Sequence, residues 1–154
     1  MSNVAIITGA GSGFGLGLAK ELTDRGWIVY ATDRDSVALE KAREFSAIAR
    51  RMDVTNRSDI DAVVKEAIAD HGRIDLMVAN AGYGNFSSVE ETPPEEVRRI
   101  FEVNVFGVEN SIRAVLPQMR KQRSGRIITA AAFILAVTWN RNTFYFTFKS
   151  RFTI

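Results

Sequence analysis

Thr8-Gly9-Ala10-Gly11-Ser12-Gly13-Phe14-Gly15 is a glycine-rich segment that separates two apolar segments near the start of this chain. Before it, the β-branched run Val4-Ala5-Ile6-Ile7 is typical of a buried strand. After it, Leu18, Ala19 and Leu22 recur at helical spacing. A strand, a glycine-rich turn and a helix suit phosphate groups, because the N–H groups at a helix N-terminus attract anions and glycine permits close approach. The sequence therefore predicts nucleotide binding at this turn.

Apolar runs and amphipathic segments continue to alternate along the chain. Further strands are expected over residues 27–32, 48–54, 74–79 and 126–130, and further helices around 37–42, over 59–71 and over a long segment from 92 to 123. Thr92-Pro93-Pro94-Glu95 predicts that the long helix starts with Thr92 as its N-cap. This alternation predicts an α/β fold, a doubly wound parallel sheet with helices on both faces. The length of 154 residues fits one domain, over residues 1–154.

Composition excludes several classes of function. The net charge is only +2 and the basic residues are dispersed, so nucleic-acid binding is not expected. The chain has no cysteine, which excludes disulfides and thiolate metal sites, and no metal is expected. It has no apolar run of about 18 residues, so we expect no membrane span. The first strand begins too close to Met1 for a signal peptide, so a cytoplasmic protein is expected.

Asp33 ends the second predicted strand, about twenty residues beyond the glycine-rich turn. In a dinucleotide-binding fold, a carboxylate here accepts hydrogen bonds from the adenosine ribose and repels a 2′-phosphate. This favours NAD over NADP. Arg34 beside it could instead bind such a phosphate, and Asp33 could simply be a turn residue at a helix entry. We expect NAD as the cofactor, with NADP less favoured.

Asn104 interrupts the apolar stripe of the long helix, between Phe101 and Val105. A buried amide without hydrogen-bond partners costs about 1–3 kcal/mol. Asn104 is therefore a structural amide with satisfied hydrogen bonds, the site of a local kink in the helix, or a functional group.

Taken together, these features resemble the short-chain dehydrogenase/reductase family, in its order and spacing and across nearly all of the chain. The matching positions are Thr8-Gly9-x-x-x-Gly13-x-Gly15, Asp33, Asp53-Val54, Asn80-Ala81-Gly82, Asn104 and Tyr145-x-x-x-Lys149. The resemblance implies a Rossmann-like fold and an NAD(P)-dependent oxidoreductase. Such an enzyme transfers hydride between nicotinamide and a small-molecule carbonyl or alcohol. Homo-oligomers are common in the family, so a homo-oligomer is expected here.

The resemblance also assigns roles to residues. The implied cofactor-binding residues are Gly9, Ser12, Gly13, Phe14, Gly15, Asp33, Arg34, Asp53, Val54, Asn80, Ala81, Gly82, Tyr145 and Lys149. Asp53 and Val54 would contact the adenine. Tyr145 would be the general acid and base, Lys149 would bind the nicotinamide ribose and lower the tyrosine pKa, and Asn104 would hold a water of a proton relay.

The chain departs from the family in two ways. Ala132 occupies the position of the serine that binds the reacting oxygen, and such a loss typically lowers the rate by a factor of about 10² or more. The chain also ends at Ile154, before the segments that complete the family's sheet and form its substrate lid. The alternative function is therefore a catalytically impaired, truncated relative that retains dinucleotide binding.

Residues 143–149 allow two conformations. Their alternation of polar and apolar side chains is typical of a strand, whereas the resemblance implies a helix. On a helix Tyr145 and Lys149 would lie about 6 Å apart, close enough to act as a pair. On a strand they would lie about 13 Å apart. We favour the helix, and the strand stays open as the alternative.

Overall fold

The computed structural model describes residues 2–85, 87, 90–130, 135–139, 142–146 and 150–153, the last three ranges as backbone strands only. The strands are β1 (Val4–Thr8), β2 (Ile28–Asp33), β3 (Ile48–Arg51), β4 (Leu76–Ala79), β5 (Arg126–Thr129), β6 (Leu135–Trp139), β7 (Asn142–Phe146) and β8 (Ser150–Thr153). The helices are α1 (Gly13–Asp24), α2 (Glu40–Arg43), α3 (Arg57–His71), α4 (Pro94–Phe101), the π-helical segment η1 (Glu102–Phe106) and α5 (Gly107–Gln122).

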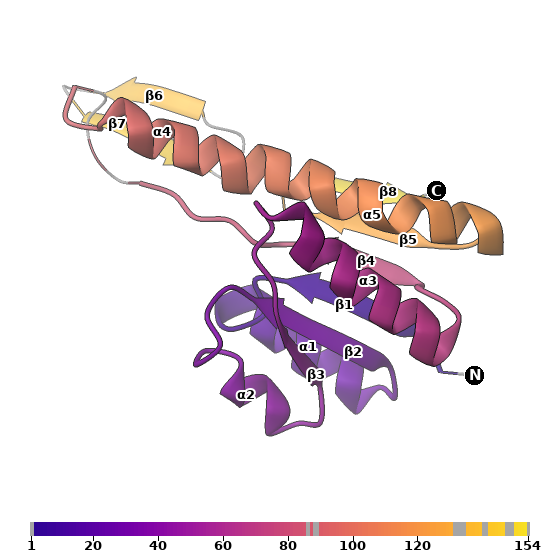
Figure 1. The fold of residues 1–154 in the computed structure, drawn as a ribbon. Coiled ribbons are helices and arrows are strands. Elements are labelled where there is room, and N and C mark those ends of the chain that lie inside the picture. The colour runs from indigo at the N-terminus through magenta and orange to yellow at the C-terminus, as the bar shows by residue number, and fades with distance from the viewer. Residues whose placement is uncertain are drawn as a thin grey trace.

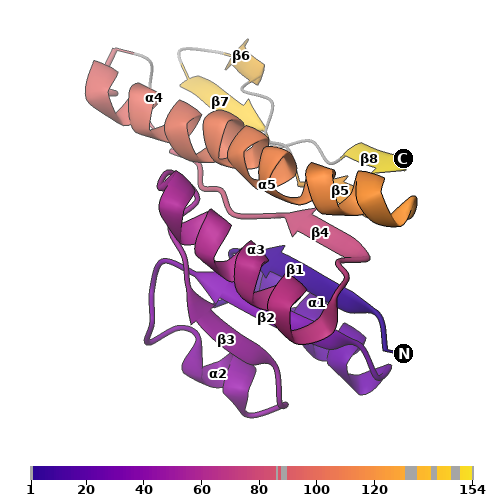
Figure 2. The same cartoon turned by 45° about the vertical axis from the view of Figure 1, so that its right-hand side comes forward.

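A single sheet with the strand order β3-β2-β1-β4-β5-β8 forms the centre of the molecule. Its first five strands are parallel, and β8 pairs antiparallel with β5. Helices α3 and α5 cover one face and α1 and α2 cover the other (Figures 1 and 2). The predicted doubly wound α/β fold is therefore confirmed.

The core consists of two layers, one on each face of the sheet. Along β1, Ile6 packs with the buried residues of α3 and α5, whereas its neighbour Ile7 packs with those of α1 and α2. Along β2, Tyr30 packs in the same layer as Ile6, and Ala31 packs in the same layer as Ile7. Because both faces are buried, these parallel strands read as continuous apolar runs in the sequence.

The reversal of strand order between β1 and β4 fixes where a ligand can bind. Successive crossovers run outward from β1 through β2 to β3, and then in the other direction through β4 to β5. The loops after β1 and β4 diverge at this point and leave a crevice at the carboxyl ends of the strands.

Two predicted helix boundaries were wrong. Helix α2 is only four residues long, and Val37, predicted to be part of it, is 79% exposed. The carboxylate of Asp35 accepts a hydrogen bond from the N–H of Val37 at 2.9 Å, so this segment forms a turn. The N-cap of α4 is Pro93, not Thr92, and Pro94 is the first helical residue.

The preferred helix for residues 143–149 was also wrong where the structure describes it. Tyr145 lies in β7 and is opposite Ala136 in an antiparallel pair with β6. The period-two alternation and the many β-forming residues explain why a strand forms there. Lys149 and Ala132 lie outside the described residues.

None of the helices within the described residues is long and apolar enough to cross a bilayer.

Candidate cofactor site

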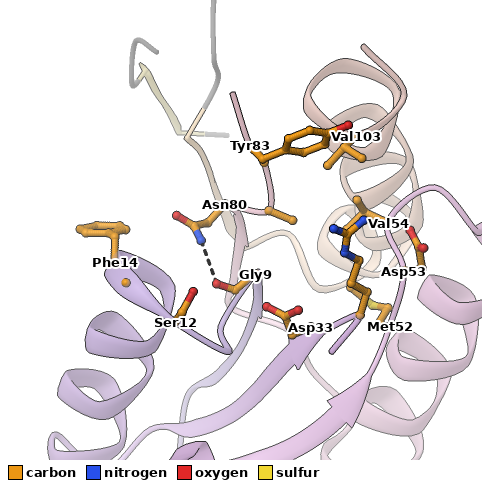
Figure 3. A pocket seen from close by; sticks show the side chains of 14 residues that line it. Gly9, Ser12, Phe14, Asp33, Met52, Asp53, Val54, Asn80, Tyr83 and Val103 are labelled. Atoms are coloured by element: carbon orange, nitrogen blue, oxygen red, sulfur yellow. Dashed lines mark hydrogen bonds between the residues drawn. The ribbon is translucent and has the colours of Figure 1, made fainter. Parts of the chain in front are cut away.

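A cavity of about 330 Å³ opens at the carboxyl ends of β1 to β4 (Figure 3). Its walls come from the ends of these four strands and the loops after them, from the N-terminus of α1 and from η1. The lining residues are Gly9, Ser12, Gly13, Phe14, Asp33, Arg34, Met52, Asp53, Val54, Asn80, Ala81, Gly82, Tyr83 and Val103. The predicted cofactor-binding residues from Gly9 to Gly82 all line this cavity except Gly15, whereas Lys149 and the side chain of Tyr145 lie outside what the structure describes.

The glycine-rich turn combines close packing with an open surface. Gly9 has a φ of +66°, and a Cβ there would lie 2.8 Å from the Cα of Ala81. A Cβ on Gly15 would lie 2.2 Å from the carbonyl oxygen of Gly9. Gly13 has a φ of +54°, but nothing lies within 4 Å of where its Cβ would be. Gly9 and Gly15 thus let the turn fold tightly, and Gly13 faces open space.

Helix α1 begins at Gly13, so its N-terminus forms part of the cavity wall. N–H groups in the first turn of a helix have no partner within that helix, and the helix dipole favours an anion beside them. The open space in front of Gly13 therefore fits the phosphate groups of a dinucleotide.

Asn80 and Thr8 tie the end of β4 to the glycine-rich turn. The Asn80 Nδ2 atom donates to the carbonyl oxygens of Thr8 at 3.0 Å and of Gly9 at 3.2 Å. The Thr8 hydroxyl oxygen accepts from the N–H groups of Asn80 at 2.9 Å and Ala81 at 2.8 Å. Asn80 therefore lines the cavity and also fixes its shape.

Asp33 is the last residue of β2, and backbone N–H groups donate to both of its carboxylate oxygens. Oδ2 accepts from the N–H of Gly11 at 3.1 Å, and Oδ1 accepts from the N–H of Asp35 at 3.0 Å. Each carboxylate oxygen can accept a second donor, so both the turn role and the ribose-binding role are compatible with this geometry. Arg34 lines the same cavity with an exposed side chain.

Asp53 follows β3 and stays ionised at neutral pH. Burial raises the pKa of its carboxyl, but hydrogen bonds from Thr55 and the charges of Arg34 and Arg51 outweigh this, and the pKa lies below its usual value. The Oδ1 atom of Asp53 accepts from the Thr55 N–H at 2.9 Å and from its hydroxyl at 2.8 Å.

Asn104 is buried in η1, and its amide is satisfied by the backbone of Tyr83. Of the interpretations open from the sequence, the geometry supports a structural amide, located where the π-helical segment interrupts the long helix. Its role in a proton relay stays a prediction. Burial, followed by the charge and hydrogen bond of Glu96, raises the pKa of Tyr83 above its usual value. The Tyr83 phenol is therefore protonated at neutral pH.

Met52, Tyr83 and Val103 line the cavity but were not among the predicted cofactor-binding residues. Tyr83 directly follows Gly82, which was predicted. Met52 directly precedes Asp53, and Val103 directly precedes Asn104. Both are ordinary apolar residues, and only their position next to a predicted site residue could have identified them. No cluster of potential metal ligands exists within the ranges that the structure describes.

Comparison with known proteins gives one consistent result. The family model for short chain dehydrogenases matches residues 3–151. The chain is 40% identical over 130 residues to a 3-ketodihydrosphingosine reductase of Bacteroides thetaiotaomicron, covering 84% of this chain and 46% of that protein. It is 36% identical over 139 residues to an (S)-acetoin-forming diacetyl reductase of Staphylococcus epidermidis, covering 86% of this chain and 54% of that one. The chain thus spans about half the length of these curated relatives.

Comparison with solved structures gives the same result as comparison with curated sequences. A 3-ketoacyl-(acyl-carrier-protein) reductase from Brucella melitensis, complexed with NADH, matches with a TM-score of 0.79 and 38% identity over 84% of this chain and 57% of its own. A short chain dehydrogenase/reductase from Burkholderia phymatum, complexed with NAD, matches with a TM-score of 0.78 and 32% identity over 85% of this chain and 49% of its own. The fold, the cavity and these similarities lead to one conclusion: the chain belongs to the short-chain dehydrogenase/reductase family.

Proposed function

We propose that this chain binds NAD(H) in the cavity at the carboxyl edge of the sheet, as the cofactor-binding part of an oxidoreductase. The observation that carries the proposal is the open space in front of Gly13, beside a helix N-terminus and in the same cavity as Asp33. When bound, NAD(H) supplies or accepts the hydride that converts a small-molecule carbonyl to an alcohol or the reverse.

Each wall of the cavity has a separate binding role in this proposal. Backbone N–H groups at the start of α1 hold the pyrophosphate. Asp33 accepts hydrogen bonds from the adenosine ribose, and its negative charge disfavours the 2′-phosphate of NADP(H). Asp53 and Val54 line the part of the cavity that receives the adenine. Two similar structures contain NADH and NAD and a third contains an NADP derivative, so the preference for a cofactor without the 2′-phosphate rests on the charge of Asp33.

A second function, dinucleotide binding without turnover, is favoured by the position of Tyr145. In the family's chemistry the tyrosine and lysine lie one helical turn apart, whereas Tyr145 lies on the strand β7. Ala132 also provides no hydroxyl group at the position of the family's serine. Both features remove groups that would donate a proton or a hydrogen bond to the reacting oxygen.

Two assays test these proposals. Calorimetric titration with NADH and separately with NADPH tests the first, and we expect NADH to bind at least about tenfold more tightly. A preference for NADPH would instead make Arg34 the determinant. Oxidation of NADH by diacetyl, on which the staphylococcal relative acts, tests the second. Binding of NADH without oxidation supports it, and measurable turnover refutes it.

A further inference from the structure

Asp59 lies behind the cavity wall and contacts the segment that carries Asp53. It belongs to the first turn of α3, its side chain is 21% exposed, and it does not line the cavity. Its Oδ2 atom accepts a hydrogen bond from the N–H of Asp53 at 3.1 Å. Its Oδ1 atom accepts one from Nδ2 of Asn56, the N-cap of α3, at 2.9 Å. One carboxylate therefore joins the end of β3 to the start of α3.

Asp59 also faces the guanidinium group of Arg51, with 3.7 Å between Oδ2 and Nη1. Arg51 ends β3, and its charge acts on the Asp53 carboxylate as well. Arg51 thus pairs with Asp59 and acts on Asp53 through its charge, together with Arg34. Without Asp59, the attraction between Arg51 and Asp53 would be uncompensated, and the arginine would be drawn toward the cavity.

The position of Asp53 indicates which part of a dinucleotide it meets. Phe14 and Asp53 lie on opposite sides of the cavity, with Gly9 and Asp33 between them (Figure 3). A carboxylate at the end of β2 binds the adenosine ribose, and the resemblance to the family implies that the adenine lies beside Asp53, after β3, the next strand in the sheet. The Oδ2 atom of Asp53 accepts no hydrogen bond from the described residues, so it can accept one from an amino group.

We propose that Asp59 is a positioning residue for the adenine end of the cavity. It fixes the Asp53 backbone and holds Arg51 away from the Asp53 carboxylate. This inference rests on the proposed function, binding of NAD(H) in this cavity.

The test compares Asp59→Ala with Asp61→Ala. Asp61 is a carboxylate two positions along the same helix that pairs with Arg57 at 2.9 Å, and it is the matched control. AMP probes the adenine end, and reduced nicotinamide mononucleotide, which lacks the adenosine, probes the other end. Affinities are measured by NMR titration. We expect Asp59→Ala to weaken AMP and NADH binding about fivefold and to leave the mononucleotide unchanged, as one lost hydrogen bond implies.

Hydrogen exchange of the Asp53 amide tests the contact without any ligand. We expect the amide to exchange faster in Asp59→Ala than in Asp61→Ala, because its acceptor is gone. Asp59→Asn keeps an acceptor for this amide but loses the charge that faces Arg51. We expect its AMP affinity to lie between those of the wild type and Asp59→Ala, and to recover when Arg51→Ala is added.

Several results would overturn the inference. One is an AMP affinity in Asp59→Ala within about twofold of the wild type. Another is an equal loss for AMP and the mononucleotide, which would mean that Asp59 only stabilises the fold. If Asp59→Ala does not fold, Asp59→Asn replaces it in the test. An AMP affinity of Asp59→Asn equal to that of the wild type would then overturn the inference. Failure of the wild type to bind NADH would refute the proposed function, whereas failure of the variants alone to differ would refute only the role of Asp59.

Discussion

The side-chain amide of Asn104 forms hydrogen bonds with both the N–H and the carbonyl group of Tyr83. Its Oδ1 atom accepts from the Tyr83 N–H at 3.1 Å, and its Nδ2 atom donates to the Tyr83 carbonyl at 2.8 Å. A Cβ on the neighbouring Gly82 would lie 3.0 Å from Asn104 Oδ1, so the two segments are in close contact. The π-helical segment thus fixes the loop after β4, which forms one wall of the cavity.

Replacing Asn104 by alanine should destabilise the protein. Two hydrogen bonds would be lost at a buried position, and we expect the free energy of unfolding to fall by about 1–3 kcal/mol. Asn110→Ala is the control, because Asn110 donates a single, longer bond of 3.3 Å to the Val54 carbonyl. Urea unfolding measures both variants. An equal fall in the free energy of unfolding in the two variants would contradict the importance of the paired hydrogen bonds between Asn104 and Tyr83.

Gly15 and Gly17 lie on the same helix but should respond in opposite ways to alanine. In Gly15→Ala the new Cβ would lie 2.2 Å from the Gly9 carbonyl oxygen, so the turn must shift. We expect a loss of about 1–3 kcal/mol in stability together with loss of NADH binding. Nothing lies within 4 Å of a Cβ on Gly17, and Gly17→Ala should gain about 0.5–1 kcal/mol. Thermal unfolding measures the stability of both variants. Similar melting temperatures for the two would refute the predicted opposite effects.

Asp75 should make stability depend on pH in the acidic range. Its carboxylate is 10% exposed, pairs with Arg73 and accepts the N–H of Val4 at 2.8 Å. Burial raises its pKa, but the hydrogen bonds from Arg73 and Val4 and the charge of Arg73 outweigh this, and the pKa is lowered in the folded state. The stabilisation is therefore complete above the unfolded pKa of about 3.9 and is lost as the pH falls through the folded pKa.

Asp75→Asn should accordingly lower the free energy of unfolding by about 1–2 kcal/mol near neutral pH. The difference from the wild type should shrink at about pH 3, where the wild-type carboxyl begins to take up its proton. Urea unfolding at both pH values measures this difference in the free energy of unfolding. Asp61→Asn is the control, because Asp61 forms an exposed ion pair with Arg57. A difference that does not change with pH would show that the charge of Asp75 contributes nothing.

Asp33→Ser should change the cofactor preference. It removes the charge that disfavours a 2′-phosphate and leaves Arg34 in the same cavity. We expect NADH to bind about tenfold more weakly, as expected for a lost charge-assisted hydrogen bond, and NADPH to bind more tightly. Asp35→Ser is the control, because Asp35 is a carboxylate of the same loop that does not line the cavity. If NADPH binding does not improve, Asp33 is not the determinant.

The first five strands and the glycine-rich turn could be predicted from the sequence because each depends on local chemistry. Strands buried on both faces appear as apolar runs, and the turn needs glycine where Gly9 and Gly15 meet other backbone atoms. The side chains that gather at the carboxyl ends of parallel strands then follow from the fold.

The differences between the sequence predictions and the structure have separate causes. Hydrogen bonds donated by nearby backbone N–H groups to the carboxylates of Asp33 and Asp35 replaced the expected start of α2. The π-helical segment η1 interrupts the predicted long helix where Asn104 contacts Tyr83, and a contact between residues so distant in sequence leaves no periodic signal. At Tyr145 the resemblance implied a helix, whereas the local alternation correctly indicated a strand.

The most direct test of dinucleotide binding in this cavity is an NMR titration of the ¹⁵N-labelled chain with NADH. We expect saturable shifts of the amides of Gly9, Gly13, Asp33 and Asp53, which line the cavity. The amides of Arg73, Ser124 and Arg126, around a separate hollow at the amino ends of the strands, should not move. Shifts confined to that opposite edge, or no shifts in a folded chain, would contradict the proposed site.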